Sequence, residues 1–197
     1  MLKTAVFVSG GGTNLQALLD AEKVGMFPHT EIALVVASKP GVFALERAAK
    51  AGVPGCVVAR KAYAAPEDYD AALLEILRAH NIDVVVLAGF LSILGKAVIE
   101  AYPDRILNVH PSLIPSFCGA GYYGLKVHEA ALARGVKVTG ATVHLVNEIP
   151  DGGRILLQKA VAVEPGDTPE TLQCRVMEQA EWQLLPQALA DLTRALD

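Results

Sequence analysis

The chain has 197 residues, of which 52% are hydrophobic and 19% are charged, and its formal net charge at pH 7 is −4. A chain of this length buries one full core but cannot hold two full-sized catalytic domains, so we expect a single domain over residues 1–197. The small negative charge argues against a nucleic-acid-binding protein. An anionic small molecule would therefore need a local site rather than the field of the whole protein.

The three cysteines, Cys56, Cys118 and Cys174, form no CxxC pair. This pattern argues against a disulfide framework or a zinc site and favours a reducing compartment. The sequence runs from Met1 directly into an apolar strand without a signal-peptide pattern, so we expect a cytoplasmic protein. The uncharged run 106–125 contains prolines and glycines and predicts an ordered loop rather than a membrane helix.

Buried strands and amphipathic helices alternate through the first part of the chain. The periodicity predicts, in chain order, strand 4–8, helix 15–20, strand 32–37, helix 43–51, strand 57–58, helix 66–80, strand 83–88, helix 96–101 and strand 105–109. Strands that are apolar throughout are typical of a parallel sheet with helices on both faces.

The pattern changes after residue 136. Strands 138–146 and 155–163 are longer and are joined by the turn 150–153, which predicts an antiparallel extension. A helix follows from 168 to 195, with a kink expected at Pro186. The predicted fold class is therefore α/β: an open, mostly parallel, Rossmann-like sheet with helices on both faces and a C-terminal antiparallel extension.

A glycine-rich loop, Ser9–Asn14, separates the first strand from the first helix. Backbone N–H groups in such a loop, together with the helix N-terminus, form an anion site. The loop matches neither G-x-x-x-x-G-K-[ST] nor G-x-G-x-x-G, and no acidic residue ends the second strand, which disfavours a nucleoside triphosphate or a dinucleotide. A monophosphate site is favoured, and a tight turn without a ligand is the alternative.

A second loop, Asn108–Pro115, leaves the carboxyl end of the fifth strand, where open parallel sheets bind their ligands. Asn108 and His110 are two residues apart, so both point to the same face. Their side chains suit hydrogen bonding to an oxyanion during acyl transfer, and His110 can also carry a proton near neutral pH. A strand-end histidine bonded only to the backbone is the alternative.

Other candidates carry less information alone. From the sequence alone, Asp151 is interpreted as a turn former. His144 is interpreted as a structural residue within a strand. His128 is placed where it could reach the site. No segment matches G-x-S-x-G, and we interpret Cys118 as an inert small residue rather than a reactive thiol.

Four motifs occur together in this sequence: Ser9–Asn14, Leu87–Leu91, Asn108–Pro115 and Asp151–Gly153. On these motifs, and over essentially its whole length, the chain closely resembles the phosphoribosylglycinamide formyltransferase family. The resemblance implies that the formyl group of the co-substrate 10-formyltetrahydrofolate passes directly to the amine of glycinamide ribonucleotide, in de novo purine biosynthesis. It implies a tetrahedral oxyanion intermediate and no metal.

The resemblance also implies residue roles. Asn108 and His110 would stabilise the oxyanion, with His110 handling a proton, and Asp151 would hold the catalytic water and pair with His110. Substrate binding would fall to Gly12, Thr13 and Asn14 at the phosphate and to Glu181 at the ribose. The residues implied in folate binding are Leu91, Ser92, Ile93, Leu94, Asn108, Asn147, Glu148, Ile149, Pro150 and Asp151.

The sequence departs from the family at three places. Pro66 and Ser92 stand where many members have arginine, so the resemblance assigns no residue to the folate tail. The insert Cys118–Tyr123 is longer than in the shortest relatives and is expected to shape the wall beside the substrate amine. One extra residue lies between Arg175 and Pro186.

Two other functions stay open: a 10-formyltetrahydrofolate hydrolase and a non-catalytic phosphosugar-binding protein. A methionyl-tRNA formyltransferase would need a further C-terminal domain and a basic surface. The expected partners are the two small molecules, without nucleic acid or membrane, and the expected state is a monomer or a homodimer.

Overall fold

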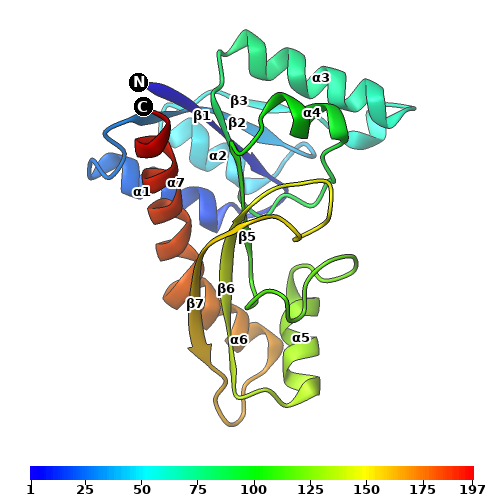
Figure 1. The fold of residues 1–197 in the computed structure, drawn as a ribbon, viewed down its shortest axis with the longest axis vertical. Coiled ribbons are helices and arrows are strands. Elements are labelled where there is room, and N and C mark those ends of the chain that lie inside the picture. The colour runs from blue at the N-terminus through cyan, green and yellow to red at the C-terminus, as the bar shows by residue number, and fades with distance from the viewer.

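Seven strands form one sheet in the order β3-β2-β1-β4-β5-β6-β7 in the computed structural model, which describes residues 1–197 (Figure 1). Strands β1 to β5 are parallel, whereas β6 runs antiparallel to β5, and β7 antiparallel to β6. The strands are β1 (Leu2–Val8), β2 (Thr30–Ala37), β3 (Gly55–Val57), β4 (Val84–Leu87), β5 (Ile106–His110), β6 (Val138–Leu145) and β7 (Ile155–Ala162).

Helices follow most of the strands. They are α1 (Thr13–Lys23), α2 (Phe43–Lys50), α3 (Pro66–Ala79), α4 (Lys96–Ala101), α5 (Leu125–Arg134), α6 (Pro169–Val176) and α7 (Trp182–Leu196). A 3-10 turn spans Arg60–Ala62, and a π-helical turn spans Met177–Glu181. The predicted class is confirmed, including the antiparallel C-terminal extension. None of the helices combines the length and hydropathy that crossing a membrane requires.

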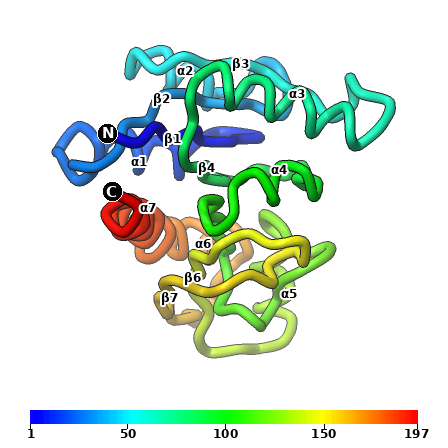
Figure 2. The backbone as a smooth tube through the Cα atoms, turned by 45° about the horizontal axis from the view of Figure 1, so that its top comes forward, coloured from blue at the N-terminus to red at the C-terminus, as the bar shows by residue number.

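Strands β1, β2, β4 and β5 contribute to two hydrophobic cores, because their side chains alternate between the two faces of the sheet. On one face, residues such as Val6 and Val86 pack with α1, α2 and α7. On the other face, Phe7 and Val85 pack with α3 and α4. Helix α6 packs on the β6–β7 extension through a small third core and lies beside α5 (Figure 2).

The topology places a crevice at the carboxyl ends of β1 and β4. The sheet grows from β1 toward β2 and β3 on one side, and from β4 toward β5 on the other. The direction of strand addition reverses between β1 and β4, and open α/β sheets bind their ligands at such a reversal. The glycine-rich loop leaves β1 there, and the segment 88–95 leaves β4. Strand β5 pairs with β4 as far as Asn108 and extends beyond it to His110.

The C-terminal helix differs from its prediction. Helical residues run from Pro169 to Leu196, close to the predicted 168–195, but a π turn at Met177–Glu181 interrupts the α-helical pattern. Proline removes the N–H that would bond the carbonyl four residues earlier, here that of Trp182, and its ring crowds that carbonyl. The π turn ends at Glu181, directly before Trp182, so the irregularity lies one turn before the proline.

Candidate active site

The glycine-rich loop ends in a backbone conformation that needs glycine. Gly12 has φ of 73° and precedes the first turn of α1. A Cβ atom at Gly12 would lie 2.7 Å from the Cβ of Ala44 on α2. Arg47, also on α2, donates from Nε to the Gly11 carbonyl over 2.8 Å. Helix α2 therefore holds the loop from behind, and the pocket opens on its other side.

This first pocket, the glycine pocket, is lined without a lysine or an arginine. Its lining residues are Ser9, Gly10, Gly11, Gly12, Thr13, Asn14, Ala88, Gly89, Leu91, Val109, Pro111, Gly124, Gln173, Met177 and Glu181. The attraction for an anion must therefore come from backbone N–H groups and the amino end of α1.

Asn14 and Glu181 meet in the wall of the glycine pocket. Asn14 Nδ2 donates to Glu181 Oε2 over 2.7 Å, and both side chains are buried. Burial raises the pKa of Glu181 to about 7, although the hydrogen bond from Asn14 acts in the opposite direction. The Oδ1 atom of Asn14 is buried and accepts no hydrogen bond, which leaves an acceptor for a ligand.

The π turn explains how Glu181 reaches this wall. A π-helical turn closes i to i+5 and so contains more residues per turn than an α-helix. Met177 and Glu181, at its two ends, both line the glycine pocket.

A second pocket, the apolar pocket, lies beside the first. One wall carries Ser92, Ile93 and Leu94, and the opposite wall is the segment Asn147–Asp151. Its other lining residues are Leu87, Phe90, Ile99, Asn108, His144 and Val146. The two segments predicted to enclose a folate ring therefore face one another, except that Leu91 lines the glycine pocket instead.

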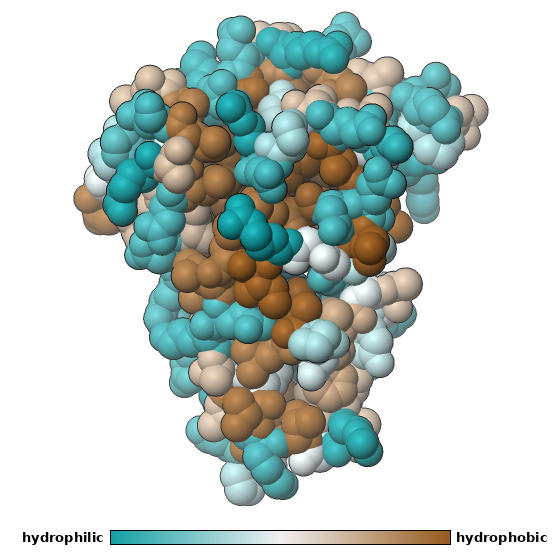
Figure 3. Space-filling model, in the orientation of Figure 1, coloured by the Kyte–Doolittle hydropathy of each residue, from teal (hydrophilic) through white to brown (hydrophobic).

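Backbone contacts fix the segment that leaves β4. The Leu91 N–H donates to Ser9 Oγ over 2.9 Å, and the Gly95 N–H donates to the buried Asp70 Oδ1 over 3.0 Å. Between these anchors, Ile93 is 79% exposed at the lip of the apolar pocket, and Ile149 on the opposite lip is 65% exposed. Apolar residues also gather across the middle of the face shown in Figure 3.

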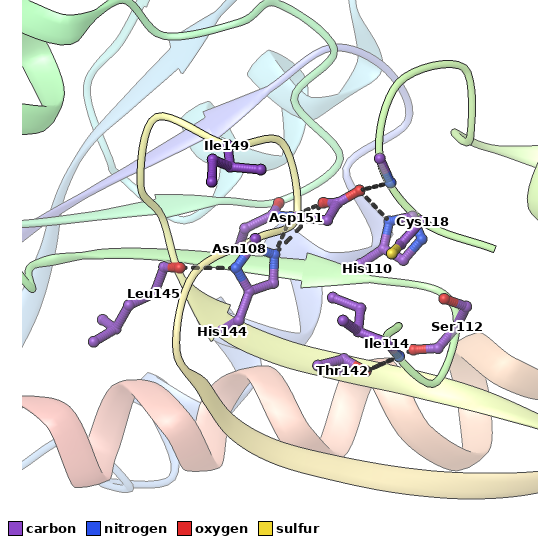
Figure 4. Close-up of polar contacts among 12 residues, drawn as sticks. Asn108, His110, Ser112, Ile114, Cys118, Thr142, His144, Leu145, Ile149 and Asp151 are labelled. Atoms are coloured by element: carbon purple, nitrogen blue, oxygen red, sulfur yellow. Dashed lines mark hydrogen bonds and ion pairs between the residues drawn. The ribbon is translucent and has the colours of Figure 1, made fainter. Parts of the chain in front are cut away.

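Four polar side chains converge beside the apolar pocket (Figure 4). Asn108 and His110 come from β5, His144 from β6, and Asp151 from the β6–β7 loop. Asp151 Oδ2 lies 3.5 Å from His110 Nδ1, and Asp151 Oδ1 lies 3.5 Å from His144 Nε2. Asn108 Nδ2 lies 3.4 Å from Asp151 Oδ1 and 3.0 Å from His144 Nε2. The predicted catalytic residues Asn108, His110 and Asp151 are thus brought together.

The Asp151 side chain is 14% exposed and well supplied with donors. Burial raises the pKa of Asp151, but the contact with His144, the hydrogen bond from the Gly119 N–H and the nearby imidazoles outweigh it and leave the pKa below its ordinary value. The Gly119 N–H donates to Oδ2 over 2.8 Å. The insert Cys118–Tyr123 therefore contacts the cluster directly through its backbone.

A hydrogen-bonded loop supports His110. Its Nε2 donates to the Phe117 carbonyl over 2.8 Å, which leaves Nδ1 facing Asp151. The loop in between is held by Thr142 on β6, whose Oγ1 donates to the Ser112 carbonyl over 2.6 Å and accepts from the Ile114 N–H over 3.1 Å. His110 is therefore fixed at both ring nitrogens.

Two histidines show what the sequence interpretation missed. The structural role favoured for His144 overlooks its contacts with Asn108 and Asp151. These contacts follow from the β5–β6 register, which pairs His144 with Asn108. In the sequence, only the alternation of side chains along the strand indicated which face His144 occupies. His128 is fully buried near His110 without a partner for either ring nitrogen, and burial lowers its pKa to about 4, with His110 adding to the effect.

Comparison with known proteins agrees with this geometry. The sequence model of the formyl transferase family matches residues 2–189. The chain belongs to the formyl transferase family. Glycinamide ribonucleotide transformylase 1 from Symbiobacterium toebii is 40% identical, with 99% of this chain and 89% of that chain covered and a TM-score of 0.92. Phosphoribosylglycinamide formyltransferase from Brucella melitensis is 41% identical, with 98% and 95% covered and a TM-score of 0.87.

Curated members of the formyl transferase family include much longer proteins. The trifunctional purine biosynthetic protein adenosine-3 of Gallus gallus is 44% identical over 188 residues, which are 95% of this chain but 18% of that protein. The chloroplastic phosphoribosylglycinamide formyltransferase of Arabidopsis thaliana is 42% identical over 179 residues, which are 90% of this chain and 61% of that protein. The chain thus spans less than two thirds of these relatives.

The glycine loop gives a stability prediction. The variant Gly12→Ala should lower the free energy of unfolding by roughly 1–3 kcal/mol, because the positive φ and the contact with Ala44 both oppose a side chain. Gly11→Ala is the matched control, since a Cβ there meets nothing within 4 Å. Urea unfolding of both variants measures the difference, and equal midpoints would contradict the strain.

Glu181 gives a pH prediction. Its folded pKa of about 7 lies above the ordinary value of 4.5, so the stabilising effect is complete below pH 4.5 and is lost as pH rises through 7. The loss is on the order of 3 kcal/mol. Glu181→Gln should lose less stability than the wild type between pH 5 and pH 8. Glu178→Gln, which changes an exposed residue of the same turn, should follow the wild type in urea unfolding at both pH values.

Proposed function

We propose that this chain is a phosphoribosylglycinamide formyltransferase, which transfers the formyl group of 10-formyltetrahydrofolate to the amine of glycinamide ribonucleotide. The observation that carries the proposal is the convergence of Asn108, His110 and Asp151 beside an apolar pocket that adjoins an anion-binding glycine loop. Relatives that carry this name cover almost the whole chain.

The two pockets match the two substrates in chemistry. The ribonucleotide phosphate suits the N–H groups of Gly12, Thr13 and Asn14 at the start of α1, and Glu181 suits the ribose hydroxyls as an acceptor. The flat, partly apolar pterin ring suits the apolar pocket between Ser92–Leu94 and Asn147–Asp151. Leu91 lines the adjoining pocket, so we place it between the two substrates.

In the proposed reaction the substrate amine attacks the formyl carbon, and the carbonyl oxygen becomes an oxyanion. Asn108 donates a hydrogen bond to that oxyanion, and His110 does so through Nε2 once Nε2 leaves the Phe117 carbonyl; such donors are the stabilisation acyl transfer needs. The proton lost by the amine passes through water held at Asp151, with His110 as its partner, to the folate nitrogen that leaves. The formyl–nitrogen bond to folate breaks as the tetrahedral intermediate collapses, so formyl and proton have exchanged places.

The proposal extends to the domain organisation, the cellular compartment and the oligomeric state. We infer that residues 1–197 act as one formyltransferase domain, since all seven strands form one sheet. The three unpaired cysteines favour a reducing compartment such as the cytoplasm. Two small-molecule substrates suffice for the activity, in a monomer or a homodimer.

The proposal predicts formyl transfer that depends on the amine. The purified chain should consume 10-formyltetrahydrofolate only when glycinamide ribonucleotide is added, as followed by the absorbance of the folate product. Consumption without the amine would indicate a hydrolase. If neither mixture reacts while both ligands bind in calorimetry, the chain is a binding protein and the proposal fails.

The catalytic assignment predicts large losses of turnover. His110→Ala and Asp151→Asn should each lower kcat by about a hundredfold or more, which is the range for a lost general acid or base. His80→Ala is the control, because His80 lies at the end of α3 with Nδ1 near the Ile76 carbonyl. Near-normal kcat in either site variant, with an unchanged thermal transition, would remove that residue from the mechanism.

A further inference from the structure

The ring of His144 is fixed by a group that can only accept hydrogen bonds. Its Nδ1 lies 2.8 Å from the Leu145 carbonyl oxygen, so Nδ1 carries a proton. The imidazole is 1% exposed and cannot turn toward solvent. Gly153 passes so close to this carbonyl that a Cβ would collide with it, which keeps the contact in place. In a neutral His144 ring, Nε2 is therefore an acceptor.

This tautomer decides which end of the Asn108 amide faces His144. The Asn108 nitrogen Nδ2 lies 3.0 Å from His144 Nε2 and 3.4 Å from Asp151 Oδ1. Both neighbours are acceptors while His144 is neutral, so both amide hydrogens are engaged within the cluster (Figure 4). The amide oxygen, which accepts no hydrogen bond from the protein, is the free end.

The free end of the Asn108 amide is its oxygen, which cannot donate the hydrogen bond that the proposed reaction needs. An oxyanion needs a donor, and the Asn108 amide supplies one only after a half-turn about its last bond. That turn places the amide oxygen beside His144 Nε2 and the Asp151 carboxylate. Two acceptors would then face the oxygen, and a proton on Nε2 would turn the nearer of them into a donor.

We propose that protonated His144 is a positioning residue, which turns the Asn108 amide so that its NH2 group faces the formyl oxygen. In this form Nε2–H donates to the Asn108 oxygen and to Asp151 Oδ1, while Nδ1–H stays on the Leu145 carbonyl. The inference rests on the proposed function, since it concerns the donor to the formyl oxygen.

One acidic side chain contacts the His144 ring. Asp151, from the β6–β7 loop, is the acidic group in contact with it. The other oxygen of that carboxylate faces His110 from β5, and the Gly119 N–H donates to the same oxygen. Strand β5 otherwise presents the neutral Asn108 to His144. The Lys96–Glu148 pair is a separate contact on exposed side chains.

Nitrogen-15 NMR of the free protein tests the amide turn without any catalysis. Protonation of His144 Nε2 should shift the side-chain NH2 resonances of Asn108 with the same midpoint as the His144 ring nitrogens. In His144→Gln these resonances should not titrate. Asn108 resonances that ignore the protonation of His144 would overturn the proposal, whatever the chain catalyses.

Kinetics test whether the turn serves the reaction. His144→Leu should lower kcat by about tenfold or more and leave both KM values within about twofold, because only transition-state stabilisation is lost. His144→Gln should recover most of kcat, since the Asp151 charge orients its NH2 group as a permanent donor toward this corner. The decline of kcat at alkaline pH caused by loss of the His144 proton should be absent in His144→Gln.

A double variant separates positioning from packing. In the Asn108→Ala background, His144→Leu should have no further effect on kcat, because the side chain it acts through is gone. The proposal would be overturned if the two substitutions lowered kcat by independent factors that multiply in the double variant. It would also be overturned if His144→Gln were as slow as His144→Leu. His80→Leu is the matched control for losing a histidine. A wild type that fails to transfer formyl groups contradicts the proposed function instead, and the NMR titration still decides the role of His144.

Discussion

The buried carboxylate of Asp151 is the contact on which the catalytic corner depends. It joins β5, β6 and the insert, through His110, His144 and the Gly119 N–H. A buried charge is tolerated only when donors surround it, and here three separate chain segments supply them. Removing the carboxylate would leave two histidines without their shared partner, so the positions of Asn108 and His110 are set by a residue some forty positions downstream.

The reversal of β6 makes this convergence possible. Because β6 runs antiparallel to β5, His144 pairs with Asn108 and Thr142 pairs with His110. Alternation then puts all four side chains on one face of the sheet. Thr142 holds the loop after β5, while His144 contacts the amide of Asn108. The two-strand extension therefore supplies the second half of a site whose first half ends the parallel sheet.

Local patterns predicted much of this arrangement, and long-range register accounts for the rest. Strand and helix order follows from hydrophobic period, and the shared face of Asn108 and His110 follows from a spacing of two. The contact of His144 with Asn108 depends on the β5–β6 register, which no local pattern encodes. The local sequence around Asp151 predicts only a turn, because its contacts with β5 and β6 are long-range. Only the family resemblance assigned Asp151 a chemical role. The π turn Met177–Glu181 lies inside the predicted C-terminal helix and has no counterpart in the sequence prediction.

Two acids of the site differ in burial and in hydrogen-bond supply, and their pKa values move in opposite directions. Asp151 accepts from a backbone N–H and faces two imidazoles, so its pKa stays below the ordinary value despite burial. Glu181 is more deeply buried and accepts only from the Asn14 amide, so burial dominates and its pKa rises to about 7. The difference suits the neighbours of each acid. An anionic Asp151 balances histidine charge where protons move, whereas a full charge on Glu181 would repel an anion held by backbone N–H groups alone.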